Sequence, residues 1–126
     1  MMTFNETLDT HIRAIQRRDL PALIATLPDE GEEIVLIMAD GRLVRSVAEF
    51  VEAHRGWFAS PTWVLEATPV KTFEAPGLGV AVLQLDYRDV PEGGAPIHEQ
   101  SYLTLVFELR GKRWVMVQDQ NTPMRV

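Results

Sequence analysis

The sequence contains no cysteine, which excludes disulfide bonds, thiolate nucleophiles and cysteine-based zinc sites. Basic residues are few: 12 Lys and Arg stand against 18 Asp and Glu, a formal net charge of −6. This balance argues against general binding to nucleic acid or to anionic membranes. The longest apolar run, residues 34–39, is far too short to cross a bilayer, and the N-terminus does not read as a basic, apolar signal segment. We therefore expect a cytoplasmic protein.

The length and composition predict one globular domain that spans residues 1–126. A chain of 126 residues is a typical domain length, and 46% hydrophobic with 24% charged residues is ordinary for a globular fold. No repeat, low-complexity tract or linker interrupts the chain.

Helices are predicted first. Apolar residues at helical spacing predict helices over residues 4–18, 19–27 and 47–58. Thr3 with Glu6, and Ser46 with Glu49, have the spacing of capping boxes before the first and third helices.

Strands are predicted after the helices, apart from a short hairpin over residues 34–45. Asp40 and Gly41 indicate its two-residue turn, in which both residues need a positive φ. Longer strands follow at 62–73, 80–90, 97–110 and 114–121, and Pro69 indicates an edge strand or a bulge. The prediction is an α+β fold with helices on one face of a curved antiparallel sheet.

The register of the last hairpin predicts two different sheet faces. If Arg110 pairs with Arg113, one face carries large apolar side chains, among them Leu105, Phe107, Trp114 and Met116. The opposite face would pair Val106 with Val117, Thr104 with Asp119, and Tyr102 with Asn121, followed by Gln100 and His98.

A polar end over a valine floor is typical of a small-molecule pocket. Asp119 could act as general base if burial raised its pKa, with His98 or a helix histidine as acid partner or orienter. The alternative is a solvated or subunit-contacting sheet face.

The remaining candidate residues come from the helices. His54 lies on the apolar face of the third helix and His11 flanks that of the first, so each either lines the pocket or is a core-edge histidine bonded to a carbonyl. Trp57 is either core or a pocket wall. The three histidines lack local metal-ligand spacing and no nucleotide-binding motif occurs, so we expect neither a metal site nor a cofactor.

The order helix, short helix, hairpin, helix and long strands resembles the nuclear transport factor 2-like (NTF2-like) superfamily. That group includes ketosteroid isomerases, SnoaL-like polyketide cyclases, scytalone dehydratase and the kinase association domain. The resemblance covers nearly the whole chain and is carried by residues 18–23, 40–43 and 111–123. The third stretch is the most specific: it begins with a glycine, a tryptophan follows soon after, and alternating apolar residues then lead into a polar tail.

This resemblance implies a cone-shaped, cystatin-like sheet with three helices over its concave face and a pocket inside. Val117, Asp119 and Asn121 would point inward. The apolar residues would then form an outer patch, covered by a second subunit in a homodimer: Leu103, Leu105, Phe107, Trp114 and Met116.

Departures from the family pattern keep two functions open. Ketosteroid isomerases are similar in fold and use an aspartate base on the first hairpin strand and a second aspartate that stabilises an oxyanion. In this sequence apolar residues stand where the base would fall, within the stretch 33–37, and where the second aspartate would fall, near Val106. His11 matches the tyrosine of their first helix. Asp119 with His98, His11 or His54 could imitate the aspartate–histidine pair of SnoaL-like cyclases. We expect a pocket for a small, largely apolar molecule, with Asp119 and His11 catalysing proton abstraction; the alternative is a non-catalytic dimeric ligand-binding or assembly domain.

Overall fold

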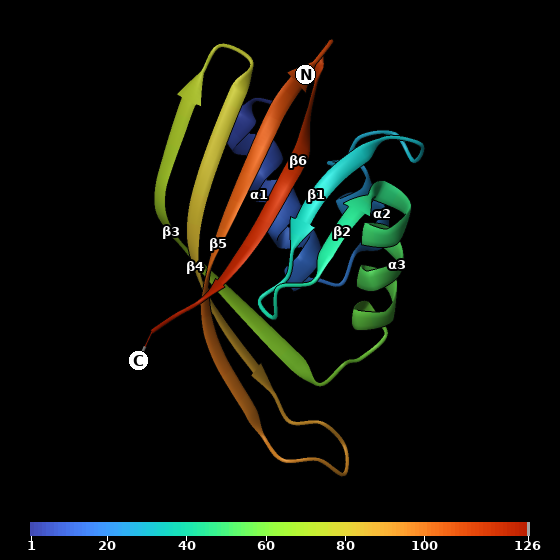
Figure 1. Cartoon of the computed structure of the whole chain (residues 1–126), viewed down its shortest axis with the longest axis vertical. Coiled ribbons are helices and arrows are strands. Elements are labelled where there is room, and N and C mark those ends of the chain that lie inside the picture. Colours follow the sequence, from blue (N-terminus) through green and yellow to red (C-terminus); the bar gives the residue numbers. More distant parts are fainter. Residues whose placement is uncertain (126) are drawn as a thin grey trace.

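The computed structural model describes residues 1–125 and folds as an α+β structure (Figure 1). Three helices come early in the chain: α1 (Phe4–Gln16), α2 (Leu20–Ile24) and α3 (Val47–Phe58). Six strands form a single curved sheet: β1 (Glu33–Ile37), β2 (Leu43–Ser46), β3 (Trp63–Ala75), β4 (Leu78–Asp89), β5 (Ile97–Arg110) and β6 (Arg113–Pro123). Within residues 1–125, no helix is both long enough and apolar enough to cross a membrane.

The sheet is mixed, whereas the sequence predicted a purely antiparallel one. Its strand order is β2-β1-β6-β5-β4-β3. The long strands β3 to β6 form antiparallel neighbours, but β1 lies parallel to β6, with Leu36 opposite Asp119. This pairing joins the early hairpin to the end of the chain, so it brings residues of β1 beside the polar end of β6.

The helix caps follow the sequence closely. The hydroxyl of Thr3 accepts from the Glu6 amide and the Glu6 carboxylate accepts from the Thr3 amide, which completes the first predicted capping box. Only half of the second box forms: Ser46 accepts from the Glu49 amide, while the Glu49 carboxylate accepts from the Ser46 hydroxyl instead of its amide. Ser46 also ends β2, where it pairs with Glu33.

The β1–β2 turn differs from the two-residue turn predicted. Gly41 has a φ of 89°, but Asp40 is not in the left-handed region, so only one position requires glycine. The Met38 amide donates to the Arg42 carbonyl and the Gly41 amide donates to the Met38 carbonyl. The prediction of a hairpin is confirmed, with a longer loop.

Pro69 lies at a bulge on an edge strand, as its place in the sequence predicted. β3 is the last strand of the sheet, and its register against β4 shifts between Pro69 and Lys71. A proline is tolerated here because an edge strand does not need every backbone amide for pairing.

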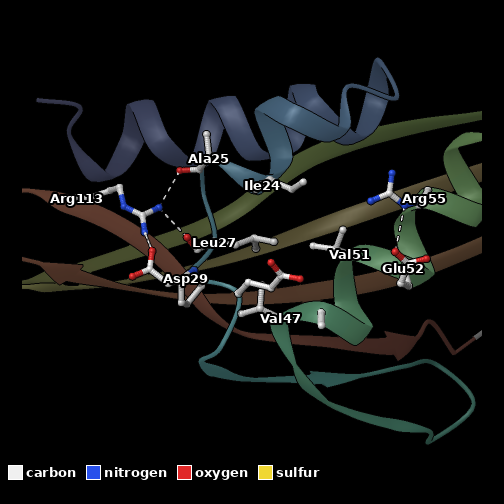
Figure 2. Close-up of a pocket in the computed structure, with 12 residues that line it drawn as sticks. Ile24, Ala25, Leu27, Asp29, Val47, Val51, Glu52, Arg55 and Arg113 are labelled. Atoms are coloured by element: carbon white, nitrogen blue, oxygen red, sulfur yellow. Dashed lines mark hydrogen bonds and ion pairs between the residues drawn. The ribbon is translucent and has the colours of Figure 1, made fainter.

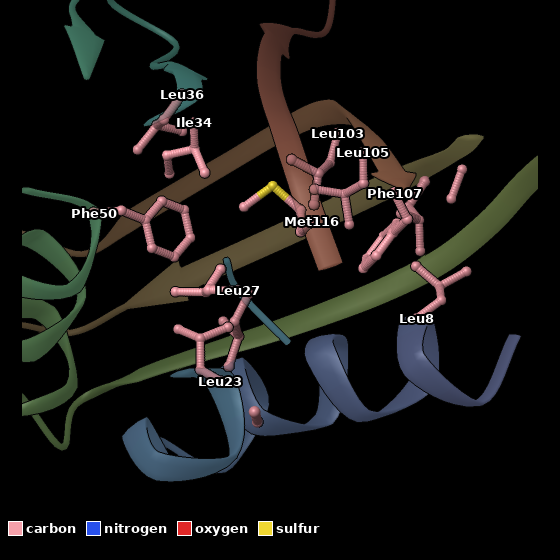
Figure 3. Packing of buried hydrophobic residues seen from close by; sticks show 14 of the residues in the cluster. Leu8, Leu23, Leu27, Ile34, Leu36, Phe50, Leu103, Leu105, Phe107 and Met116 are labelled. Carbon is pink, nitrogen blue, oxygen red and sulfur yellow. The ribbon is translucent and has the colours of Figure 1, made fainter. Parts of the chain in front are cut away.

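The large apolar side chains of the long strands face the helices, and this face is called the inner face below. Phe4 of α1 contacts both Phe107 and Trp114 with ring centroids 5.6 Å apart. Figure 3 shows side chains of the helices packed against strand residues of this face. The sequence analysis placed five of these residues on an outer patch between subunits, and that placement is wrong, because all five are buried within the chain: Leu103, Leu105, Phe107, Trp114 and Met116.

Within the part of the chain that the structure describes, the opposite, outer face of the sheet carries no helix (Figure 1). One row of side chains on this face runs across three strands, with Phe73 opposite Val80 and Val80 opposite Val106. Phe73 is 56% exposed there, whereas Phe107 on the inner face is completely buried. The two faces of the same strands therefore have different environments, and a side chain's face decides what chemistry it can support.

Candidate functional site

A bulge in β6 decides which polar residues reach the inner face. Phe107 pairs with Met116, but the next residue of β5, Val106, pairs with Gln118, so Val117 is the extra residue. Beyond the bulge Leu105 pairs with Asp119, and Leu103 pairs with Asn121. Asp119 and Asn121 therefore share the inner face with the apolar core.

The polar face predicted from the sequence is wrong in its pairing. The partners of Val106, Thr104 and Tyr102 are Gln118, Gln120 and Thr122, instead of Val117, Asp119 and Asn121. A bulge exchanges the faces of all later residues because side chains alternate along a strand. The predicted candidates are thus divided between two faces of the sheet.

Asp119 is a buried carboxyl group with no cationic partner among the described residues. It is 4% exposed, and the Asn121 Nδ2 donates a hydrogen bond of 3.1 Å to its Oδ1. Burial raises the pKa of Asp119 to about 7, and the hydrogen bond from Asn121 opposes that rise only in part. The Asn121 Nδ2 also donates to the Ile37 carbonyl at 3.3 Å, which ties this pair to β1.

His11 of α1 is completely buried above the inner face. Its ring meets the Phe107 ring edge-on, with centroids 5.7 Å apart, and its Nδ1 lies 2.7 Å from the Thr26 hydroxyl oxygen. Burial, with a smaller contribution from the nearby His54, lowers the pKa of His11 to about 3. The imidazole is therefore neutral at pH 7, which argues against the role of acid partner for Asp119; the alternative role of orienter stays a prediction.

His54 of α3 lies in an aromatic cluster close to His11. Its Nδ1 donates to the Phe50 carbonyl at 2.8 Å, and its ring stacks on Phe50 with centroids 4.0 Å apart. Burial lowers the pKa of His54, and the carbonyl opposes this. Trp57 is 5.9 Å from His54 and stacks on the buried Trp63 at 4.2 Å, so it is part of the inner-face packing.

The other predicted candidates lie on the outer face, where His98 and Gln100 surround Asp86. The His98 Nε2 is 2.7 Å from the Asp86 Oδ1, and the Gln100 Nε2 donates to the same oxygen at 3.2 Å. These bonds, with that from Arg88, lower the pKa of Asp86 to about 2, His98 having the largest effect. The sheet separates this group and its neighbours from Asp119, so they cannot line one pocket with it: His98, Gln100, Tyr102, Thr104 and Val106.

Sequence reasoning missed Asp86 and Thr26. The signal for Asp86 was available, because polar residues alternate along β4 at Gln84, Asp86 and Arg88. Thr26 is completely buried and contacts His11, but a single threonine beside leucines gives no recognisable pattern.

A groove of about 760 Å³ lies between α3 and the segment after α2 (Figure 2). Leu27, Val47 and Val51 form its apolar floor. Arg113 at one end donates to the Ala25 and Leu27 carbonyls, and Arg55 at the other is 3.2 Å from Glu52, so both cations have partners. A second cavity of about 240 Å³ lies along α1 and α2.

Neither cavity is lined by Asp119, His11 or His54. The pocket expected around Asp119 thus stays a prediction. Among residues 1–125, no three His, Cys, Asp or Glu side chains come together in a way that could hold a metal ion.

Comparison with known proteins places this geometry in a family. The model of the SnoaL-like domain matches residues 4–124. No curated protein matches the chain.

Three solved structures share the fold. A proposed calcium/calmodulin-dependent protein kinase type II association domain from Thiobacillus denitrificans has a TM-score of 0.79 and 16% identity, over 98% of this chain and 96% of that one. A proposed dehydratase of the NTF2-like family from Streptomyces avermitilis has a TM-score of 0.78 and 11% identity, over 95% and 92%. A proposed ketosteroid isomerase from Shewanella frigidimarina has a TM-score of 0.71 and 15% identity, over 92% and 91%. At these identities the similarity concerns the fold alone.

Proposed function

The chain belongs to the SnoaL-like domain family, and from that membership we propose that it is an enzyme acting on a small, largely apolar molecule. Asp119 would remove a proton from a carbon next to a carbonyl group. The carbonyl oxygen takes up the electron pair as an enolate. In an isomerisation the proton then returns to another carbon of the substrate. In a dehydration the enolate expels a β-hydroxyl group, which takes the proton and leaves as water, and in a cyclisation the enolate carbon attacks a second carbonyl group, whose oxygen takes the proton.

The observation that carries the proposal is the state of Asp119. A general base works best when its pKa lies near the working pH, and burial raises the pKa of Asp119 to about 7. Groups with such perturbed pKa values concentrate at functional sites. Asn121 holds one carboxyl oxygen, which would leave the other free to accept the proton.

The structural neighbours support this reaction class without fixing the substrate. Two of them are named as a proposed dehydratase and a proposed ketosteroid isomerase. Removal of a proton beside a carbonyl group would serve either kind of reaction. Since His11 is neutral, we assign the proton transfer to Asp119 alone.

Hydrogen–deuterium exchange of an apolar ketone tests the proposal. We expect the protein to accelerate exchange of the α-protons of β-tetralone in D₂O, followed by ¹H NMR. Asp119→Asn should abolish this acceleration, because an amide is not a base. Asp86→Asn is the matched control, since it removes an outer-face carboxylate and should leave the rate unchanged. Equal exchange rates with wild type and with Asp119→Asn would refute the proposal.

The outer face supports a second function, self-association as a homodimer or assembly domain. Phe73, Leu78 and Tyr102 are 56%, 43% and 39% exposed on this helix-free face. A second copy of the chain would cover them, and one structural neighbour is named as an association domain.

Light scattering during gel filtration tests this second function. We expect wild type to elute as a dimer and Phe73→Asp to elute as a monomer. Val90→Asp is the matched control, because Val90 is 65% exposed but lies after the end of β4. A monomeric wild type at all concentrations would exclude the dimer and leave the enzyme proposal untouched.

A further inference from the structure

The Thr26 hydroxyl determines which nitrogen of His11 carries the proton. The Thr26 Oγ lies 2.6 Å from the Leu23 carbonyl, which can only accept, so the hydroxyl hydrogen points there. The same Oγ lies 2.7 Å from the His11 Nδ1 and must therefore accept from it. Neutral His11 is thus protonated on Nδ1, and its Nε2 carries a lone pair.

The Nε2 of His11 is buried and has no partner among the described residues. Buried polar groups in native proteins are almost always paired with protein, water or ligand. The Nε2 cannot avoid being unpaired by taking up a second proton, because burial keeps the pKa of His11 near 3. At neutral pH the Nε2 therefore needs a hydrogen-bond donor from outside the chain.

The His11 ring lies in an aromatic environment. The edge-on Phe107 ring borders the imidazole, and the nearby His54 also carries its proton on Nδ1, bonded to the Phe50 carbonyl. A carbonyl oxygen would be repelled by the lone pair of the His11 Nε2, whereas a hydroxyl group would donate to it and be bound.

We propose that the His11 Nε2 recognises a hydroxyl group, as in a phenol or an enol, on the apolar ligand of the inner-face site. His11 is then a ligand-binding residue that selects hydroxyl over carbonyl, and Thr26 is the positioning residue that fixes its tautomer. This inference rests on the proposed function in placing the ligand on the inner face beside Asp119.

Phenol and toluene test the inference because they differ in shape by little more than a hydroxyl and a methyl group. In the full chain labelled with ¹⁵N, phenol should move the His11 Nε2 resonance upfield, and toluene should not. Phenol should bind about tenfold or more tightly than toluene, since a site built to bond a hydroxyl rejects the analogue without it. Equal affinities, binding of neither probe, or a wild-type spectrum with the proton on Nε2 would overturn the inference.

Two substitutions of Thr26 separate tautomer control from simple packing. Thr26→Ser keeps the hydroxyl and should keep the preference for phenol. Thr26→Val has nearly the same shape but accepts no hydrogen bond, so the proton should move to Nε2 and the preference should disappear. Should Thr26→Val fail to fold, loss of the preference in His11→Phe decides instead.

Asp119→Asn distinguishes this inference from the proposed function. The inference requires the preference for phenol to survive in that variant, whereas the proposed function requires the ketone exchange to be lost. If the exchange persists and the preference survives, only the role of Asp119 is refuted. If the preference is absent from wild type while exchange is lost in Asp119→Asn, only the role of His11 is refuted.

Discussion

The inner and outer faces of the sheet each hold one strongly perturbed carboxyl group, and the two are perturbed in opposite directions. Asp119 on the inner face is buried without a cation, and its pKa rises to about 7. Asp86 on the outer face bonds to His98, Arg88 and Gln100, and its pKa falls to about 2. Residue type does not distinguish them: burial under the helices raises the pKa of one, and hydrogen bonds from His98 and Arg88 lower the pKa of the other. Of these two carboxyl groups, the one on the inner face therefore has the pKa that suits a base at neutral pH.

The same contrast separates two phenylalanines of the one sheet, on strands β5 and β3, which flank β4. Phe107 is fully buried among Phe4, His11 and the rest of the core, whereas Phe73 is 56% exposed. The three predictions that follow use pairs of substitutions on or near these faces, beginning with the largest expected effect.

We expect Phe107→Ala to lower the free energy of unfolding by about 3–5 kcal/mol, because it leaves a cavity in a packed core. Phe73→Ala should change the free energy of unfolding of a dilute sample by about 0.5 kcal/mol or less. Urea denaturation of both variants at low protein concentration measures the difference. A similar loss for both would mean that the outer face is as well packed as the inner one.

Asp119→Asn should stabilise the protein in a pH-dependent way. Below about pH 4 the carboxyl group is protonated in both the folded and the unfolded chain, so wild type and variant should have similar pH responses. As the pH rises, the unfolded chain ionises first, and wild type loses stability until the pH passes about 7. The variant avoids this loss, which amounts to roughly 2–4 kcal/mol at pH 9.

Asp86→Asn should have the opposite effect on the stability of the fold. The pKa of Asp86 is lowered, so its ionised form stabilises the fold above about pH 4 and that stability is lost as the pH falls toward 2. The variant should therefore be less stable than wild type at neutral pH. Urea denaturation at several pH values measures the free energy of unfolding of wild type and both variants. Titration of His11 contributes equally to all three, so it cancels in the differences.

A difference between Asp119→Asn and wild type that does not change with pH would contradict the burial of an uncompensated carboxyl group.

Local signals in the sequence predicted most of the elements. Capping residues located the starts of α1 and α3, and Pro69 predicted a bulge on what is the edge strand. These features depend on a few neighbouring residues, so the sequence carries them. The predicted second helix instead ended too late, since α2 stops at Ile24.

Non-local features were predicted less well. The alternation in β6 continues smoothly through Val117, so nothing marks it as the extra residue that exchanges the two faces. The parallel pairing of β1 with β6 joins segments more than 80 residues apart, and no local pattern encodes it. The family resemblance pointed Asp119 and Asn121 inward, as the structure places them, but the register argument that agreed with it had the wrong partners.

The candidate site was predictable in its residue types more than in its assembly. Asp119, His11, His54 and Trp57 were selected because a carboxylate and histidines on apolar faces suggest chemistry, and all four lie on the helix side of the sheet. The pairing of His11 with Thr26 depends on how the turn after α2 packs against α1, so it required the structure.

The smallest expected effect concerns the close approach of α1 to the inner face. A Cβ added to Gly79 would lie 2.4 Å from the Phe4 ring, so the ring and its helix would have to move. Gly79→Ala should therefore destabilise the fold by about 1–3 kcal/mol, the usual cost of overpacking. Gly56→Ala is the control: nothing lies within 4 Å of an added Cβ in α3, and alanine should stabilise that helix by about 0.5–1 kcal/mol. Thermal unfolding of the two variants should give shifts of opposite sign. A Gly79→Ala variant as stable as wild type would mean that Phe4 can leave the inner face at little cost, and the helix layer that buries Asp119 would then be looser than this packing indicates.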